Sequence, residues 1–341
     1  MLRGCSALVV MMSHLRAYSL PAYGALPFTD KGLLTALFYT VTRPGHAAVM
    51  IFFVLSGFLV GGQVLRHLRE GRFDVLRYSI DRGTRILVPL VPALLLSAIV
   101  AISVGVVFPI EDIAAHIVGL NGVLVATTRA NAPLWSLSYE IWFYVLMGCV
   151  GYAISRRFFS ILAIAGLAAS ALIFSVLDSQ YLFFWLLGAF FAAYPPRSLW
   201  VAYISAAAFV GGMFLSQMVS EGGPWAGYAV GPADTIMCFG LATLLPALCH
   251  ERVNRVLQPA ALAIRGLSAM SYSLYIFHYP LLVFLTFHFF PVSPGLTGIA
   301  PMAAKGALLF VACGVFYVLF ERRTVAIRSR LSAMLTKQVP A

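Results

Sequence analysis

The chain has 341 residues, of which 61% are hydrophobic and only 10% are charged, and its formal net charge is +11. With a mean hydropathy of +0.91, this much apolar surface does not fit one soluble core, whereas repeated apolar stretches of about twenty residues fit a lipid bilayer. The composition therefore excludes an ordinary soluble enzyme and indicates an all-α, polytopic membrane protein. The five cysteines stand singly without CxxC spacing, so neither a disulfide framework nor a metal site is expected.

Hydropathy predicts about ten transmembrane helices in a single integral-membrane domain, residues 1–341. Because cytoplasmic loops carry an excess of Lys and Arg, the pattern places both termini in the cytoplasm. This orientation leaves few of the 23 Lys and Arg residues on the opposite side: Arg16, Lys31, Arg43, Arg129 and Lys305. The predicted spans are 4–22, 47–65, 86–107, 133–153, 158–177, 181–194, 199–219, 233–249, 267–290 and 302–320.

The basic residues are spread over the loops of one side, so they do not indicate a nucleic-acid partner. The loop between the second and third spans is an exception, because residues 66–85 carry six arginines against three acidic residues. Anionic lipid headgroups explain part of this density, and a polyanionic cytosolic ligand is the alternative, since guanidinium groups suit phosphate oxygens. In the second span, Gly57 and Gly61 form a GxxxG pattern that predicts close helix packing.

Three ionisable side chains are predicted at similar depth in the membrane. His14 lies about 16 Å along the first span from Arg3 and on the same helix face, since eleven steps of about 100° nearly complete three turns. Glu140 lies about 10 Å into the fourth span, and His278 about 16 Å into the ninth. Such groups are costly in lipid, so we predict that they converge on one site for proton transfer. Hydrogen bonds that only hold helices together are the alternative.

Pro280 lies two residues after His278 in the ninth span. Its ring removes an amide hydrogen and clashes with the carbonyl of Ile276, which loosens this turn of the helix. If the turn borders a polar cavity, we expect the freed carbonyl to face polar atoms. A kink that merely fits a curved helix bundle is the alternative.

Five sequence blocks occur together in a characteristic order. They are Arg3-x10-His14, GHAAVMIFFVLSGFLV at 45–60, Arg82-x-x-Arg85 with Pro89, LWSLSYEIWFYVL at 134–146, and SYSLYIFHYPLL at 271–282. In combination they resemble the acyltransferase-3 family of membrane O-acyltransferases. The blocks cover the first half of the chain and the ninth span.

The resemblance implies a ten-helix core that transfers an acyl group, most often acetyl, from cytosolic acyl-CoA to a hydroxyl of a glycan. The implied acceptors are cell-surface glycans, exopolysaccharides or their lipid-linked precursors. The implied location is the bacterial inner membrane, among membrane lipids and the polysaccharide biosynthesis machinery, and no metal is required. Many relatives carry a C-terminal esterase-like domain; because only residues 321–341 follow the last predicted span, we expect the core-only kind.

The resemblance also assigns roles to residues. His14 matches the family's essential first-helix histidine and Arg3 its paired arginine, and we expect His14 to act as general base. Arg82 and Arg85 are expected to hold the phosphates of acyl-CoA. The remaining candidates are Glu140 in catalysis and Trp135, Ser136, Tyr139, Tyr275 and His278 in substrate binding or support.

Two alternatives stay open for these candidates. The aromatic rings of Trp135 and Tyr139 suit stacking against sugars, but they also suit an aromatic belt at the membrane interface. A proton-coupled carrier or flippase for a glycan or glycolipid would use the same midplane His and Glu residues as a proton relay.

Two features depart from the family pattern. The chain begins at Met1-Leu2-Arg3, directly on the first motif, so the start codon is expected to be assigned late or the first turn to be missing. Asp81 stands beside Arg82 where a double arginine is usual. This substitution lowers the positive charge near the donor's phosphates and predicts a weaker affinity for the donor.

Overall fold

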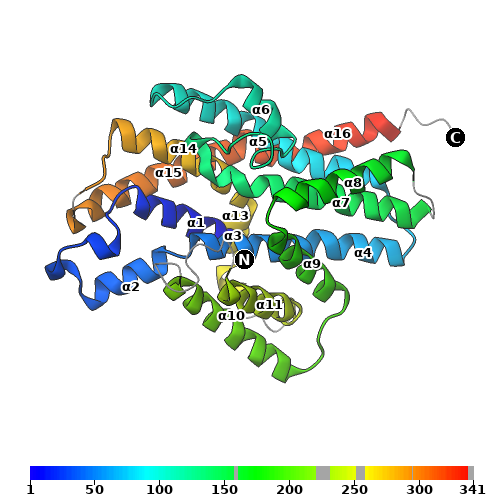
Figure 1. The fold of residues 1–341 in the computed structure, drawn as a ribbon, viewed down its shortest axis with the longest axis horizontal. Helices are drawn as coiled ribbons and strands as arrows, with labels where there is room; N and C mark the ends of the chain where they lie inside the picture. The colour runs from blue at the N-terminus through cyan, green and yellow to red at the C-terminus, as the bar shows by residue number, and fades with distance from the viewer. Residues whose placement is uncertain (157–159, 220–230, 251–257, 294, 337–341) are drawn as a thin grey trace. The chain divides into compact units, whose positions relative to one another are not determined.

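The computed structural model describes residues 1–156, 160–219, 231–250, 258–293 and 295–336, and these form helices and no strand (Figure 1). The predicted all-α class is therefore confirmed. The α-helices are α1 (Leu2–Ala17), α2 (Leu33–Thr42), α3 (Gly45–Ser56), α4 (Gly62–Arg69), α5 (Val75–Ser103), α6 (Ile110–Ile117), α7 (Trp135–Arg156), α8 (Ile161–Val176), α9 (Ser179–Ala193), α10 (Leu199–Val219), α11 (Pro232–Leu248), α13 (Ala261–Ala269), α14 (Ser271–His288), α15 (Ile299–Leu319) and α16 (Thr324–Thr336). Short 3-10 segments are η1 (Tyr23–Ala25), η2 (Phe28–Asp30), η4 (Arg129–Leu134), η5 (Gln258–Ala260), η6 (Leu296–Gly298) and η7 (Glu321–Arg323), and η3 (Gly57–Gly61) is a π-helix.

Several helices are long and apolar enough to cross a membrane. Within the described residues there are five, or six if the pair α13 and α14, bent by 57°, is one span. Helices α8, α9 and α11 are apolar but shorter. The protein is thus a multi-pass membrane protein, while the count of ten spans stays a prediction. The five long helical segments are Leu33–Arg69, Val75–Ser103, Arg129–Arg156, Leu199–Gln217 and Leu296–Leu335.

Helix boundaries differ from the predicted spans where polar residues extend a helix. Helix α5 starts at Val75, well before the span predicted from position 86, because the Asp74 side chain caps its first turn. The Oδ1 atom of Asp74 accepts hydrogen bonds from the backbone N–H groups of Leu76 (2.9 Å) and Arg77 (3.1 Å). A hydropathy profile cannot detect this turn, because its residues are polar. In the fifth predicted span, residues 158–159 lie outside the described residues.

The chain folds into two compact units. Helices α3, α5, α7 and α13 each contribute residues to both. The first unit contains Met1–Ala48, Gly83–Trp135 and Gly266–Ala341, and the second contains Val49–Arg82 and Ser136–Arg265.

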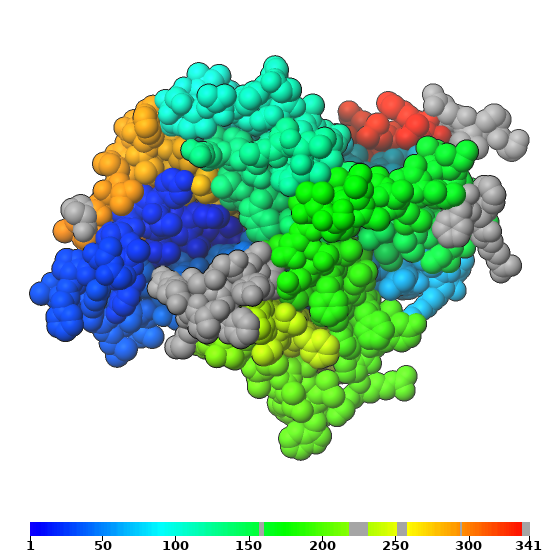
Figure 2. Space-filling view, viewed as in Figure 1, coloured from blue at the N-terminus to red at the C-terminus, as the bar shows by residue number. Residues whose placement is uncertain are grey.

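In the first unit, α1 packs against α14 and α15. The ribbon shows the three helices side by side (Figure 1), and the space-filling view shows the blue atoms of α1 directly against the orange atoms of the other two (Figure 2). The buried ammonium group of Lys305 links all three, because it donates to the carbonyl of Tyr18 (2.9 Å) and to the hydroxyl of Thr286 (3.1 Å). A cation at the C-terminal end of α1 satisfies a terminal carbonyl and complements the helix dipole.

In the second unit, α9 packs closely against the glycines of the second span. A Cβ atom on Gly57 would lie 1.8 Å from the carbonyl oxygen of Trp185, and one on Gly188 would lie 2.1 Å from that of Val54. Both approaches are too close for any side chain. The close helix packing predicted from Gly57 and Gly61 is therefore confirmed.

Candidate active site

A pair of histidines joins α1 to α14. The Nδ1 atom of His14 lies 2.9 Å from the Nε2 atom of His278, and the rings stack with centroids 5.2 Å apart and an interplanar angle of 17°. His278 is fully buried, whereas His14 is only partly buried. The two residues are 264 positions apart in the chain. A buried imidazole thus holds one face of a second imidazole that keeps part of its surface accessible.

The pair is oriented by its immediate neighbours. The Nδ1 atom of His278 lies 2.8 Å from the carbonyl oxygen of Leu274, one helical turn earlier. The Tyr279 ring stands edge-on to the His14 ring, with centroids 5.1 Å apart. Its hydroxyl is hydrogen-bonded to that of Tyr18 at 2.6 Å. Aromatic and hydrogen-bonding contacts therefore restrict how either imidazole can rotate.

The helix turn loosened by Pro280 faces polar atoms, as is expected for a turn that borders a polar cavity. The side-chain amide of Asn131 donates to the freed carbonyl of Ile276 (2.9 Å) and to the hydroxyl of Ser97 (3.1 Å). Asn131 itself is fully buried. Sequence reasoning missed this residue, although a polar amide beside an apolar span was a usable signal. The amide replaces the backbone hydrogen bond that proline cannot make.

A second contact fixes the same part of α14. The hydroxyl of Tyr275 donates to the carbonyl of Pro133 at 3.1 Å. Both Tyr275 and Pro133 are buried. Tyr275 therefore supports the helix that carries His278, in agreement with a supporting role.

The carboxylate of Glu321 lies at the start of α14 and interacts electrostatically with two of the predicted site arginines. Glu321 accepts hydrogen bonds from the backbone N–H (2.8 Å) and the hydroxyl (2.7 Å) of Ser273. This position satisfies an amide of the first helical turn, where an anion is also favoured by the helix dipole. The charges of Arg85 and Arg3 act on the same carboxylate. Sequence reasoning missed Glu321, although an acid directly after the last predicted span is notable in a chain with 12 acidic residues.

In the second unit, Glu140 belongs to a polar network with Tyr144 on the same face of α7. The Tyr144 hydroxyl donates to the Glu140 carboxylate and lies 3.4 Å from the hydroxyl of Ser56. The indole N–H of Trp185 donates to that same Ser56 hydroxyl at 3.2 Å. The guanidinium of Arg82 stands over the Tyr144 ring, 5.7 Å from its centroid. Glu140 is thus linked through Tyr144 to a predicted donor-binding arginine.

The candidate residues at the start of α7 differ in exposure. Tyr139 is buried against the rings of Phe53 and Tyr181, and its hydroxyl accepts a hydrogen bond from the backbone N–H of Asp178 at 3.1 Å. This packing favours a structural role over sugar stacking. Ser136 is also buried, whereas Trp135 keeps part of its ring accessible.

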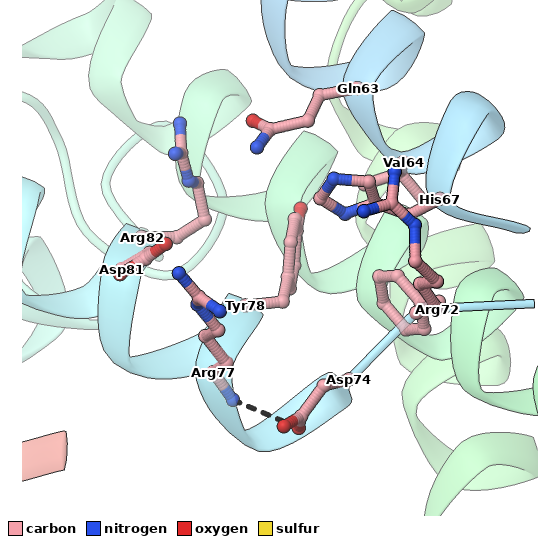
Figure 3. Close-up of a pocket in the computed structure, with 10 residues that line it drawn as sticks. Gln63, Val64, His67, Arg72, Asp74, Arg77, Tyr78, Asp81 and Arg82 are labelled. Atoms are coloured by element: carbon pink, nitrogen blue, oxygen red, sulfur yellow. Dashed lines mark hydrogen bonds between the residues drawn. The ribbon is translucent and has the colours of Figure 1, made fainter. Parts of the chain in front are cut away.

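A cavity of about 450 Å³ lies in the second unit, where the arginine-rich segment meets α4. In Figure 3 the guanidinium groups of Arg77 and Arg82 lie on one side of the Tyr78 ring, and the imidazole of His67 lies on the other. The Nε atom of Arg82 is buried and has no hydrogen-bond partner within the described residues. The complete lining is Gln63, Val64, His67, Arg72, Phe73, Asp74, Arg77, Tyr78, Asp81 and Arg82.

Comparison with known proteins identifies the family. A family model described as an acyltransferase domain matches residues 1–320. The chain belongs to the acyltransferase-3 family. It is therefore a multi-pass membrane acyltransferase that transfers an acyl group to a hydroxyl-bearing acceptor. The comparisons found no match among curated proteins and none among solved structures.

Within this acyltransferase, the predicted site residues fall into separate groups. His14 and His278 contact each other directly in the first unit. Glu140 belongs to the second unit, so its convergence with the histidines stays a prediction. The two arginines of the Arg82-x-x-Arg85 motif also differ, since Arg82 lines the cavity and Arg85 is not among the lining residues.

Proposed function

We propose that this acyltransferase moves an acyl group, acetyl in the simplest case, from cytosolic acyl-CoA to a hydroxyl of a glycan, with His14 as general base. The acceptor is a cell-surface glycan, an exopolysaccharide or a lipid-linked precursor. The setting is the bacterial inner membrane, together with the polysaccharide biosynthesis machinery. One observation carries the proposal: His14, partly accessible, is hydrogen-bonded through Nδ1 to a fully buried imidazole. This arrangement suits a group that must take a proton from an alcohol.

The cavity in the second unit supports binding of the donor's phosphates. Guanidinium groups bind phosphate oxygens through charge-assisted hydrogen bonds, and the cavity presents those of Arg72, Arg77 and Arg82. A buried N–H group without a partner costs about 1–3 kcal/mol, and a phosphate oxygen would satisfy the Nε–H of Arg82. Two acidic residues, Asp74 and Asp81, line the same cavity and reduce its net positive charge.

The proposed reaction is a direct transfer. The acceptor oxygen attacks the thioester carbonyl carbon while His14 takes the hydroxyl proton, a contribution of about 10²–10⁴-fold for general base catalysis. The carbon–sulfur bond then breaks, and the sulfur leaves with the electron pair. The thiolate takes the proton back from His14, so the products are the ester and free CoA. No acyl-enzyme intermediate is required.

The proposal is tested with the purified protein in lipid nanodiscs, radiolabelled acetyl-CoA and a panel of candidate glycans. We expect label to enter a glycan with the wild type and to fall at least about 100-fold with His14→Ala, because the general base is lost. His288→Ala is the matched control, since His288 is exposed and contacts Ser103 at 3.4 Å. Ordinary turnover by His14→Ala would remove His14 from the mechanism. Movement of a glycan across the membrane without transfer of label would instead support a carrier.

A further inference from the structure

We propose that His278 is a positioning residue that fixes the tautomer of His14, so that Nε2 of His14 is the atom that accepts the proton. This inference rests on the proposed function, since it specifies how the general base of that reaction is prepared. It assigns a role as hydrogen-bond donor or acceptor to each ring nitrogen of His14 and His278.

The hydrogen-bond chain starts at a backbone carbonyl. The oxygen of Leu274 can only accept, so Nδ1 of His278, at 2.8 Å, must carry the hydrogen and donate it. A neutral imidazole carries one ring hydrogen, so Nε2 of His278 is an acceptor. Across the 2.9 Å contact, Nδ1 of His14 must then be the donor. Neutral His14 therefore has its lone pair on Nε2.

The opposite assignment would require a charged His278. In that case both of its nitrogens would donate, and Nδ1 of His14 would become the acceptor. A fully buried cation is costly unless an anion compensates it. Within the described residues, no carboxylate forms a hydrogen bond or ion pair with His278. Its ring lies against the rings of His14, Tyr275 and Tyr279 and the backbone of its own helix. The neutral assignment therefore has the lower energy.

The packing of α14 fixes the position of the Nε2 atom of His278. Its ring is fully buried, and the turn that carries it is held from outside by Asn131 on the Ile276 carbonyl and by Tyr275 on the Pro133 carbonyl. Nε2 of His14, in contrast, is left without a hydrogen bond by the residues that the structure describes. One nitrogen of His14 is thus anchored and the other is available to the acceptor.

The chain of hydrogen bonds also accommodates the charge that develops during the reaction. When the acceptor hydroxyl gives its proton to Nε2, His14 becomes an imidazolium whose Nδ1–H continues to donate to His278. His278 stays neutral, and its own Nδ1–H stays on the Leu274 carbonyl. Loss of the proton from Nε2 to the departing thiolate restores the starting state. In serine hydrolases, loss of the group that sets the histidine tautomer lowers kcat about 10⁴-fold.

The first test compares His278→Leu with His278→Gln in the nanodisc assay. Leucine removes the acceptor, whereas the side-chain oxygen of glutamine lies near the place of Nε2 and can accept from Nδ1–H of His14. We expect kcat to fall about 10–100-fold in His278→Leu with unchanged KM for both substrates, and to recover within about threefold of the wild type in His278→Gln. His288→Leu is the matched control. Equal kcat in wild type and His278→Leu would overturn the proposal.

The second test reads the tautomer itself, in nitrogen-15 NMR spectra of ring-labelled histidine. The His14 signals are assigned by their disappearance in His14→Ala. We expect protonated Nδ1 and unprotonated Nε2 in the wild type and in His278→Gln, and a shift to the Nε2–H form in His278→Leu. A wild-type His14 with its hydrogen on Nε2 would overturn the inference. This readout needs no turnover, so it separates a wrong tautomer assignment from a wrong proposed reaction.

Discussion

Arg82 and Arg85 are three residues apart on one helix, yet their environments differ. The side chain of Arg82 lines the cavity and stands over the Tyr144 ring, and its buried Nε–H has no partner within the described residues. The charge of Arg85 acts on Glu321, which caps the start of α14. The sequence predicts that the Arg82-x-x-Arg85 motif binds phosphates as a pair. In the structure, Arg82 lines the cavity, whereas Arg85 interacts electrostatically with the carboxylate of Glu321.

This difference predicts a specific effect of Arg82→Ala. A charge-assisted hydrogen bond is worth about 1.5–3 kcal/mol, so we expect KM for acetyl-CoA to rise about 10–100-fold while kcat changes little. Steady-state kinetics with varied acetyl-CoA measure the effect. The matched control is Arg69→Ala, because Arg69 stands over the Tyr194 ring and donates to the Ala193 carbonyl outside the cavity lining. Equal KM values in the wild type and Arg82→Ala would exclude this cavity as the phosphate site.

Among the helices, α14 organises the first unit. Its N-terminal turn is capped by Glu321, and its middle is fixed by Asn131 at the carbonyl freed by Pro280. Its Thr286 hydroxyl shares the ammonium group of Lys305 with the end of α1. Helix α14, which carries His278, is therefore fixed at its N-terminal turn, at its middle and near its C-terminal end. Such a helix can hold an imidazole in a defined position.

The loop that follows α6 is held by a hydrogen bond to a titratable side chain, His116 of α6. The His116 ring is buried, with Nδ1 2.7 Å from the Asp112 carbonyl and Nε2 accepting from the N–H of Thr128 at 3.4 Å. Burial lowers the pKa of His116 below its ordinary value, and the hydrogen bond to Asp112 opposes this shift. The folded protein therefore binds fewer protons than the unfolded chain below about pH 6.5. The stability from neutral His116 is present above this pH and is lost as the pH falls.

We expect hydrogen exchange in residues 118–128 to accelerate between about pH 7.5 and about pH 5.5, after correction for the intrinsic rate. Protonation of Nε2 removes the acceptor for the Thr128 amide, which opens the loop. Mass spectrometry of the corresponding peptide measures the change, and the non-titrating variant His116→Gln should lose the pH dependence. Equal protection of the wild type at both pH values would contradict the prediction.

At the scale of the whole molecule, the distribution of Lys and Arg predicts the orientation of the chain. The donor is cytosolic in the proposed reaction, so the arginine-rich segment at 66–85 must face the cytoplasm. The excess of basic residues on that side is the physical basis of the prediction, since such loops resist translocation.

Reporter fusions test this orientation. Green fluorescent protein at either terminus should fluoresce, because it folds in the cytoplasm, and alkaline phosphatase inserted in the loop at 118–128 should be active. Alkaline phosphatase at the C-terminus should be inactive. Phosphatase activity from a C-terminal fusion, with no fluorescence from green fluorescent protein at the same terminus, would reverse the predicted topology.

The amino-acid sequence by itself determined the all-α membrane class and the family motifs, because hydropathy and helical periodicity are local properties. The depth of His14 and His278 in the membrane stays a prediction. The sequence also indicated the close packing at Gly57 and the polar environment of the turn before Pro280. Only the tertiary structure decided that His14 and His278 touch and that Glu321 caps α14 beside Arg3 and Arg85, and its hydrogen-bond distances are the basis of the proposed tautomers. These features depend on directed hydrogen bonds between residues far apart in the chain. Periodicity places a side chain on a helix face but not opposite a particular partner.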